Sequence, residues 1–177
     1  DELEEVADEV RKIIEDLERR LREVVKTSEK LNKENRRRTE DVEKEVEKIL
    51  RELEEKLRGD EKVRKIIEDL RRELKKAKDE SEKSNREIRE TTRRLEEEVK
   101  KIEDELRKIL EEAKDIRADE DIRKVLKELR EIIKEVEDML KEVLDRNRKL
   151  IEDNLRRLKE VLDRLRKKVR EIEEEAR

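Results

Sequence analysis

Apolar residues recur every three or four positions over three long stretches of this chain, which is the spacing of one face of an α-helix. In the first stretch the row runs from Leu3 to Leu57, and in the last it runs from Ile122 to Ala176. Both rows cover 54 residues in 15 steps, or 3.6 residues a step. A left-handed coiled coil needs about 3.5 and a right-handed one about 3.67. The pattern therefore predicts long, nearly straight helices.

Two interruptions divide the pattern. The first is Arg58-Gly59-Asp60, where the glycine suits a helix end and the aspartate suits the N-cap of the next helix. The second lies near residues 115–119, where Asp119 is followed by two more acids, as is typical of a helix start. The predicted helices span about residues 2–57, 61–115 and 120–176.

Short turns make consecutive helices antiparallel. We therefore predict an all-α fold, a single-chain up-down-up three-helix bundle that forms one domain over residues 1–177. In this arrangement, residue i of the first helix lies near residue 119 − i of the second and residue i + 119 of the third.

Polar residues replace the apolar row at one level of each helix. All 12 Ser, Thr and Asn residues fall within residues 27–39, 81–92 and 147–154. The predicted register superposes these windows as two polar layers around an apolar layer of Leu31, Ile88 and Leu150. One layer combines Ser28, Thr91 and Asn147; the other combines Asn35, Ser84 and Asn154, with Thr39 near Ser81.

Polar layers inside a helical bundle need an explanation, because a buried hydroxyl or amide without a hydrogen-bond partner costs about 1–3 kcal/mol. We expect these groups to bond one another and so to fix the helix register at some cost in stability. The predicted buried polar network comprises Ser28, Asn35, Thr39, Ser81, Ser84, Thr91, Asn147 and Asn154.

Composition narrows the possible functions. Charged residues make up 62% and hydrophobic residues 31%, but 53 basic residues nearly balance 57 acidic ones. Helical periodicity with low net charge favours long helices over disorder. The chain contains no Cys and no His, which excludes thiol nucleophiles, disulfides and histidine ligands. We expect no enzyme activity, no cofactor and no metal.

Two short motifs invite a binding function. Arg36-Arg37-Arg38 lies in a basic level of the chain, but acids are interleaved with it and stacking aromatics are absent, so we expect no nucleic-acid partner. Arg58-Gly59-Asp60 matches the tripeptide of integrin ligands, although its glycine and aspartate already serve as helix stop and helix cap. No apolar run approaches the ~18 residues of a membrane span and no targeting signal is present, so we expect a soluble protein of unassigned compartment.

A similar eight-residue motif occurs near the start of all three predicted helices. Residues 10–17 and 63–70 both read VRKIIEDL, and residues 122–129 read IRKVLKEL. With the charged surface, the minimal turns and the polar layers, the chain resembles de novo designed helical bundles with buried hydrogen-bond networks. The resemblance implies recombinant cytoplasmic expression and a monomeric structural scaffold, without native activity, whose polar layers specify helix register.

The third helix leaves an alternative open. It carries doubled apolar positions such as Ile132/Ile133 and Met139/Leu140 more often than the second helix does. This extra apolar stripe could face a partner helix or a second copy of the chain. The chain would then be a partner-binding or self-associating helical module.

Overall fold

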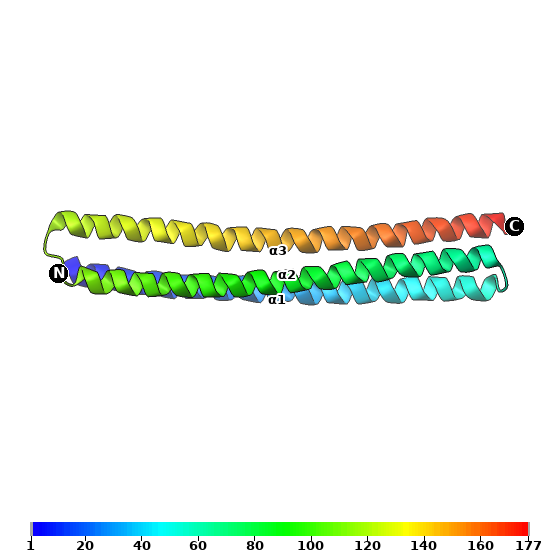
Figure 1. The fold of residues 1–177 in the computed structure, drawn as a ribbon, viewed down its shortest axis with the longest axis horizontal. Helices are drawn as coiled ribbons and strands as arrows, with labels where there is room; N and C mark the ends of the chain where they lie inside the picture. Colours follow the sequence, from blue (N-terminus) through cyan, green and yellow to red (C-terminus); the bar gives the residue numbers. More distant parts are fainter. Residues whose placement is uncertain (1, 177) are drawn as a thin grey trace. The chain divides into compact units, whose positions relative to one another are not determined.

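The computed structural model describes residues 2–176, which form three long helices joined by two short connections (Figure 1). The helices are α1 (Glu2–Lys56), α2 (Glu61–Ala113) and α3 (Asp119–Glu175). Each helix packs against the other two, and no strand occurs in the described residues. The predicted all-α, up-down-up three-helix bundle is confirmed.

The first turn depends on Gly59. Its φ of 87° lies in the left-handed region, which side chains with a Cβ rarely adopt. The Asp60 carboxylate then accepts a hydrogen bond from the backbone N–H of Lys62 at 3.0 Å, which caps α2. The two residues stop one helix and start the next.

The second turn starts α3 one residue earlier than the sequence indicated. The backbone N–H groups of Asp121 and Ile122 donate to the Ala118 carbonyl at 3.1 and 3.2 Å. Ala118 therefore occupies the N-cap position, and the helix begins at Asp119 where the sequence predicted residue 120. Asp119 is the first helical residue instead, where its charge still favours the positive end of the helix dipole.

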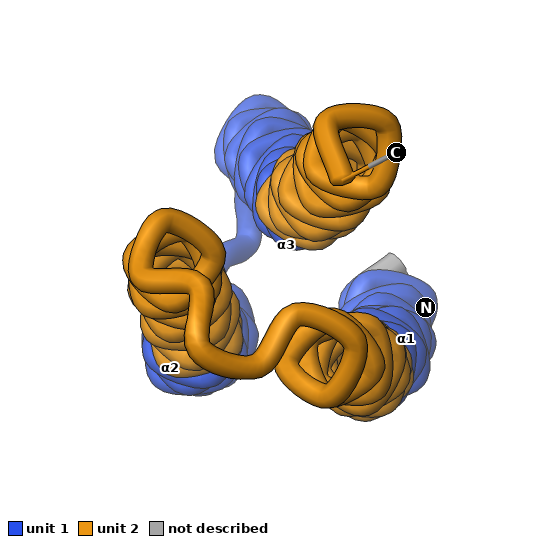
Figure 2. Tube along the Cα trace, turned by 90° about the vertical axis from the view of Figure 1, so that its right-hand side faces the viewer, with its two compact units in different colours: residues 1–29, 89–147 blue, residues 30–88, 148–177 orange. Residues whose placement is uncertain are grey.

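Contacts divide the chain into two compact units, and each contains a segment of all three helices (Figure 2). Unit 1 comprises Asp1–Glu29 and Arg89–Asn147, and unit 2 comprises Lys30–Ile88 and Arg148–Arg177.

Unit 1 has a core of apolar side chains from α1, α2 and α3. Its most deeply buried members are Val10, Leu17, Val99, Leu106 and Val136. Further apolar side chains are only half-buried against this core: Ile13, Ile14, Leu21, Ile109, Leu110, Ile122, Val125, Leu126, Ile132, Met139, Val143 and Leu144.

Unit 2 has its own apolar core, in which Val46, Leu50 and Leu165 are the most deeply buried. Ala77, Leu158 and Val161 form a smaller cluster in the same unit. Fewer half-buried apolar side chains surround these clusters: Val42, Ile49, Leu57, Ile66, Leu155, Leu162 and Val169.

Helix register follows closely the pairing that the two turns predict. In unit 1, Ser28 is hydrogen-bonded to Asn147, 119 residues further along the chain. In unit 2, Thr39 contacts Ser81, and the two residue numbers add to 120 where the sequence predicted 119. The short turns thus set the register, because each leaves little freedom to slide one helix along another.

Candidate functional site

A buried hydrogen-bonded ring joins α1 and α2 in unit 2. Asn35 Nδ2 donates to Ser81 Oγ at 3.0 Å, and Thr39 Oγ1 lies 2.8 Å from Ser81 Oγ. The Thr39 hydroxyl donates to the backbone carbonyl of Asn35 at 2.7 Å. All three residues are buried, so water does not replace these partners at the side chains.

Counting hydrogens assigns the direction of every bond in the ring. Thr39 has a single hydroxyl hydrogen, and it is used toward the Asn35 carbonyl. Ser81 must therefore donate to Thr39, while it accepts from Asn35. The ring closes from Asn35 through Ser81 and Thr39 back to Asn35, and a slip of one helix by a turn would break two of its three bonds.

Asn85 extends the ring, although it was absent from the predicted network. Its Oδ1 accepts a hydrogen bond from Asn35 Nδ2 at 2.8 Å, and its backbone carbonyl accepts one from Asn32 Nδ2 at 3.4 Å. Asn85 is only 5% exposed. The sequence does contain a signal that could have identified Asn85. It follows Ser81 by four residues and Lys78 by seven, which places all three on the face of α2 that contacts α1.

The predicted layer of Asn35, Ser84 and Asn154 does not form as a triad. Ser84 is buried, but its hydroxyl donates to the Glu80 carbonyl one turn back, at 3.1 Å. Asn154 of α3 is 2% exposed, and its Nδ2 has no hydrogen-bond partner. Between α1 and α2 the register is shifted by one residue, so Ser81 and Asn85 bond Asn35 where Ser84 was predicted.

Unit 1 contains a smaller polar contact, between α1 and α3. Asn147 Nδ2 donates to Ser28 Oγ at 3.0 Å, and both side chains are buried. The predicted third member, Thr91, is only half-buried, and Thr92 is buried in its place. Thr92 continues the buried row of Ile88 and Leu95 at steps of four and three residues, whereas Thr91 lies to one side of it.

Some buried polar atoms destabilise the fold because they have no hydrogen-bond partner. Besides Asn154 Nδ2, the buried Oδ1 atoms of Asn32, Asn35 and Asn147 have no hydrogen-bond partner. Each such atom costs about 1–3 kcal/mol relative to a bonded one. An apolar core would avoid this cost, so the polar residues are poorly explained by stability alone.

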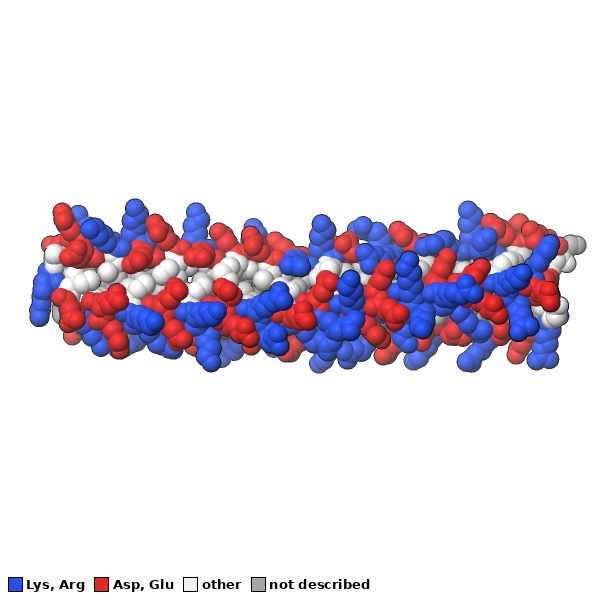
Figure 3. Space-filling view, in the orientation of Figure 1, with Lys and Arg blue, Asp and Glu red and all other residues white. Residues whose placement is uncertain are grey.

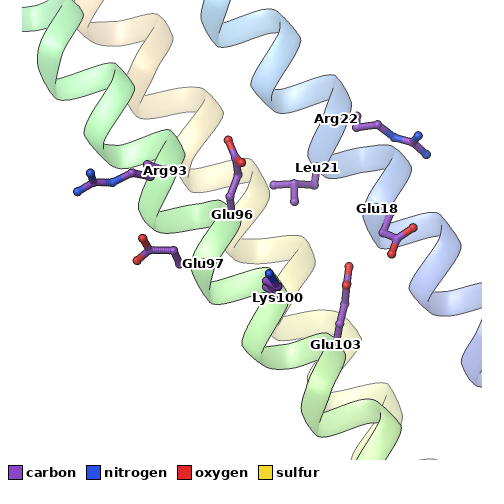
Figure 4. A pocket seen from close by; sticks show the side chains of 8 residues that line it. All are labelled: Glu18, Leu21, Arg22, Arg93, Glu96, Glu97, Lys100 and Glu103. Atoms are coloured by element: carbon purple, nitrogen blue, oxygen red, sulfur yellow. The ribbon is translucent and has the colours of Figure 1, made fainter.

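A cleft of about 520 Å³ in unit 1 carries the most perturbed carboxyl group (Figure 4). Glu103 of α2 is 8% exposed and points toward Glu18 of α1. Burial raises the pKa of Glu103, and the charge of Glu18 raises it further, against the smaller opposing effect of Arg107. No hydroxyl, thiol or amide side chain lines this cleft, so the carboxyl has no reactive partner there.

Other features of the described residues are compatible with structural roles. The Glu43 carboxylate, 3.0 Å from Nζ, raises the pKa of Lys78 by hydrogen bonding and charge. Gly59 and Asp60 line a second cleft, of about 590 Å³, in which Asp60 is engaged in capping α2. Across residues 2–176 no group of three or more acidic, His or Cys side chains could hold a metal ion. Among the same residues, none of the three helices combines the length and the apolar content of a membrane span.

Comparison with known proteins identifies no relative of this chain. No protein-family model matches the chain, and searches of curated proteins and of solved structures find no match.

Proposed function

We propose that this chain is a structural helical scaffold of designed origin, in which the buried Ser, Thr and Asn side chains specify helix register. It acts as a monomer and has no catalytic activity, cofactor or metal. Two features support a designed origin. Residues 10–17 and 63–70 have the same sequence, VRKIIEDL, and the chain carries nearly equal numbers of acidic and basic residues.

The directional ring of Asn35, Ser81 and Thr39 carries the proposal. Apolar contacts tolerate a slip of one helix past another, because one aliphatic side chain replaces another at little cost. Hydrogen bonds do not, since a slip would bury donors and acceptors without partners. The buried polar groups lower the stability of the fold, but they destabilise every other helix register more. Their role is therefore to specify one helix register.

The test is an apolar variant of the ring, combining Asn35→Leu, Thr39→Val, Ser81→Ala and Asn85→Leu. Cysteines introduced at the exposed Lys33 and Lys83 would carry spin labels in an otherwise cysteine-free chain. We expect one narrow label-to-label distance in the parent and a broadened or second distance in the variant. The melting temperature of the variant should be equal or higher.

A matched control changes apolar residues of the same unit, with Val46→Leu and Leu50→Ile, and should leave the distance distribution narrow. A single narrow distance in the ring variant would contradict the proposal. Light scattering checks the other part, since the parent should keep a monomer mass from low to high micromolar concentration.

A further inference from the structure

Unit 1 leaves an apolar row partly uncovered where α2 and α3 meet. The row consists of Ile109 on α2 and Val125, Ile132, Met139 and Val143 on α3, all half-buried against the unit 1 core. We call these five residues the unit 1 stripe. Figure 3 shows a band of uncharged atoms, drawn white, along this part of the molecule between charged side chains.

The α3 residues of the stripe lie on the side of that helix that faces α2. Glu137 marks the opposite side, because it accepts a hydrogen bond from Arg20 of α1 at 2.9 Å. At about 100° per residue, Glu137 lies to one side of the buried Val136, while Ile132 and Met139 lie about 40° and 60° to the other.

The same argument places Ile109 on the side of α2 that faces α3. Glu103 marks the α1 side of this helix, because it lines the cleft together with Glu18. Glu103 precedes the buried Leu106 by three residues and Ile109 follows it by three, so the two lie on opposite flanks.

Both borders of the stripe are acidic and exposed. On α2 the border contains Glu98, Glu105 and Glu112, spaced seven residues apart. On α3 it contains Asp121, Glu128, Glu135 and Glu142, with the same spacing. Basic residues reach the borders at Arg94, Lys124 and Arg146, and Lys101 lies one step further out on α2. Two acidic borders cannot pair with each other, and no ion pair joins α2 to α3 in the described part of unit 1.

We propose that the unit 1 stripe docks an amphipathic α-helix with one apolar face bordered on both sides by Lys or Arg. On α3 the stripe runs from Val125 to Val143, which are 18 residue steps or about 27 Å apart, and a partner helix of five turns would cover it. Its apolar face would bury the exposed parts of the stripe, and its basic borders would neutralise the acidic rows. Acidic partner residues belong opposite Arg94, Lys124 and Arg146.

Charge argues against a second copy of this chain as the occupant. A two-fold contact between copies would place the same acidic rows against each other, which like-charge repulsion disfavours. The proposal goes beyond the scaffold role and makes the sequence-based alternative specific: the partner contacts α2 as well as α3, and it is basic.

Two synthetic three-heptad peptides with the same Leu/Ile face test this, one with Lys/Arg borders and one with Glu borders. Anisotropy of a labelled peptide reports affinity for the full chain, and the methyl resonance of Met139, the single methionine, reports the place of binding. We expect the basic peptide to bind, to shift the Met139 resonance and to weaken with added salt. The acidic peptide should bind at least about tenfold more weakly.

Charge reversal on the chain provides the matched variants. Glu135→Lys and Glu142→Lys together should reverse the preference between the two peptides. The control combines Asp138→Lys and Asp145→Lys, an equal charge change with equal spacing on the outer face of the same helix, and should leave the preference for the basic peptide in place. All four positions are exposed, so neither variant disturbs the core.

Three outcomes would overturn the proposal: no binding of the basic peptide, binding without a shift of Met139, or the same reversal in the control variant. A Met139 shift that follows dimer formation of the chain alone in light scattering would favour a second copy as occupant and would also overturn it. None of these outcomes bears on the label distances that test helix register.

Discussion

The two units are built from the same three helices, but they differ in how charged side chains cover the boundaries between neighbouring helices. In unit 2, Glu80 and Glu73 of α2 pair with Arg157 and Arg164 of α3 at 3.0 and 3.6 Å. Among the described residues, seven ion pairs join different helices in unit 2, and one, Arg20–Glu137, does so in unit 1. Unit 2 also holds the hydrogen-bonded ring, whereas unit 1 holds the contact of Ser28 with Asn147.

The apolar side chains differ in the opposite sense. Twelve half-buried apolar residues pack against the core in the described part of unit 1, against seven in unit 2. Complementary charges can cover an apolar boundary with their aliphatic stems, which like charges cannot do together. The arrangement of charges therefore distinguishes a closed boundary from one that is suited to a partner.

The largest expected effect comes from cavities in the two cores. Leu106→Ala in unit 1 and Leu165→Ala in unit 2 each remove a fully buried side chain and should cost about 2–5 kcal/mol. We expect the smaller loss for Leu106, because the half-buried Ile109 and Leu110 can move into the space. Urea unfolding followed by circular dichroism measures both, and equal losses would remove the proposed difference in packing.

The ring of unit 2 can be compared with the isolated amide in the same unit. Asn35→Leu removes the donor to Ser81 and Asn85 and should destabilise by about 1–3 kcal/mol. Asn154→Leu removes an amide nitrogen without a partner and adds apolar surface, so it should stabilise by about 1 kcal/mol. The same unfolding measurement applies, and a loss of stability for Asn154→Leu would mean that this amide is bonded after all.

Glu103 predicts a pH dependence confined to unit 1. Its pKa is raised by burial, so folding takes up a proton, and its contribution to stability is greatest below the unfolded pKa and is lost as pH rises through the folded pKa. Glu103→Gln should therefore raise stability at neutral pH and flatten the acid side of the stability profile. The exposed Glu105→Gln on the same helix is the control, and identical profiles for the two variants would contradict the role of burial.

The smallest effects should come from the exposed ion pairs. Arg157→Gln and Arg164→Gln should each cost less than about 1 kcal/mol, and Arg20→Gln in unit 1 a similar amount. High salt should abolish these losses, because it screens exposed charges. Thermal unfolding at low and high salt measures this, and a loss that persists at high salt would point to packing of the arginine stems instead.

Much of the fold was predictable because it depends on local chemistry. The apolar period predicts helices, Gly59 can adopt the turn conformation that other residues avoid, and short turns leave one antiparallel arrangement. All three predicted helices end within two residues of the observed ends. Even the pairing of Ser28 with Asn147 follows from the turn positions alone.

The polar network was harder to predict, because neighbouring residues often fit the same helical face. Thr92 is buried instead of Thr91, and Asn85 bonds Asn35 where Ser84 was expected. A step of 3.6 residues lies between three and four, so either neighbour can continue the row.

The same ambiguity occurs among apolar residues. The sequence placed Leu150 in the apolar layer, but the structure buries its neighbour Ile151 more deeply. The amino-acid sequence by itself determined which helix face is buried, to within one residue, because burial follows from hydrophobic periodicity. Only the tertiary structure decided which neighbour is enclosed and which hydroxyl donates to which acceptor, because both depend on the rotation of each helix against the other two.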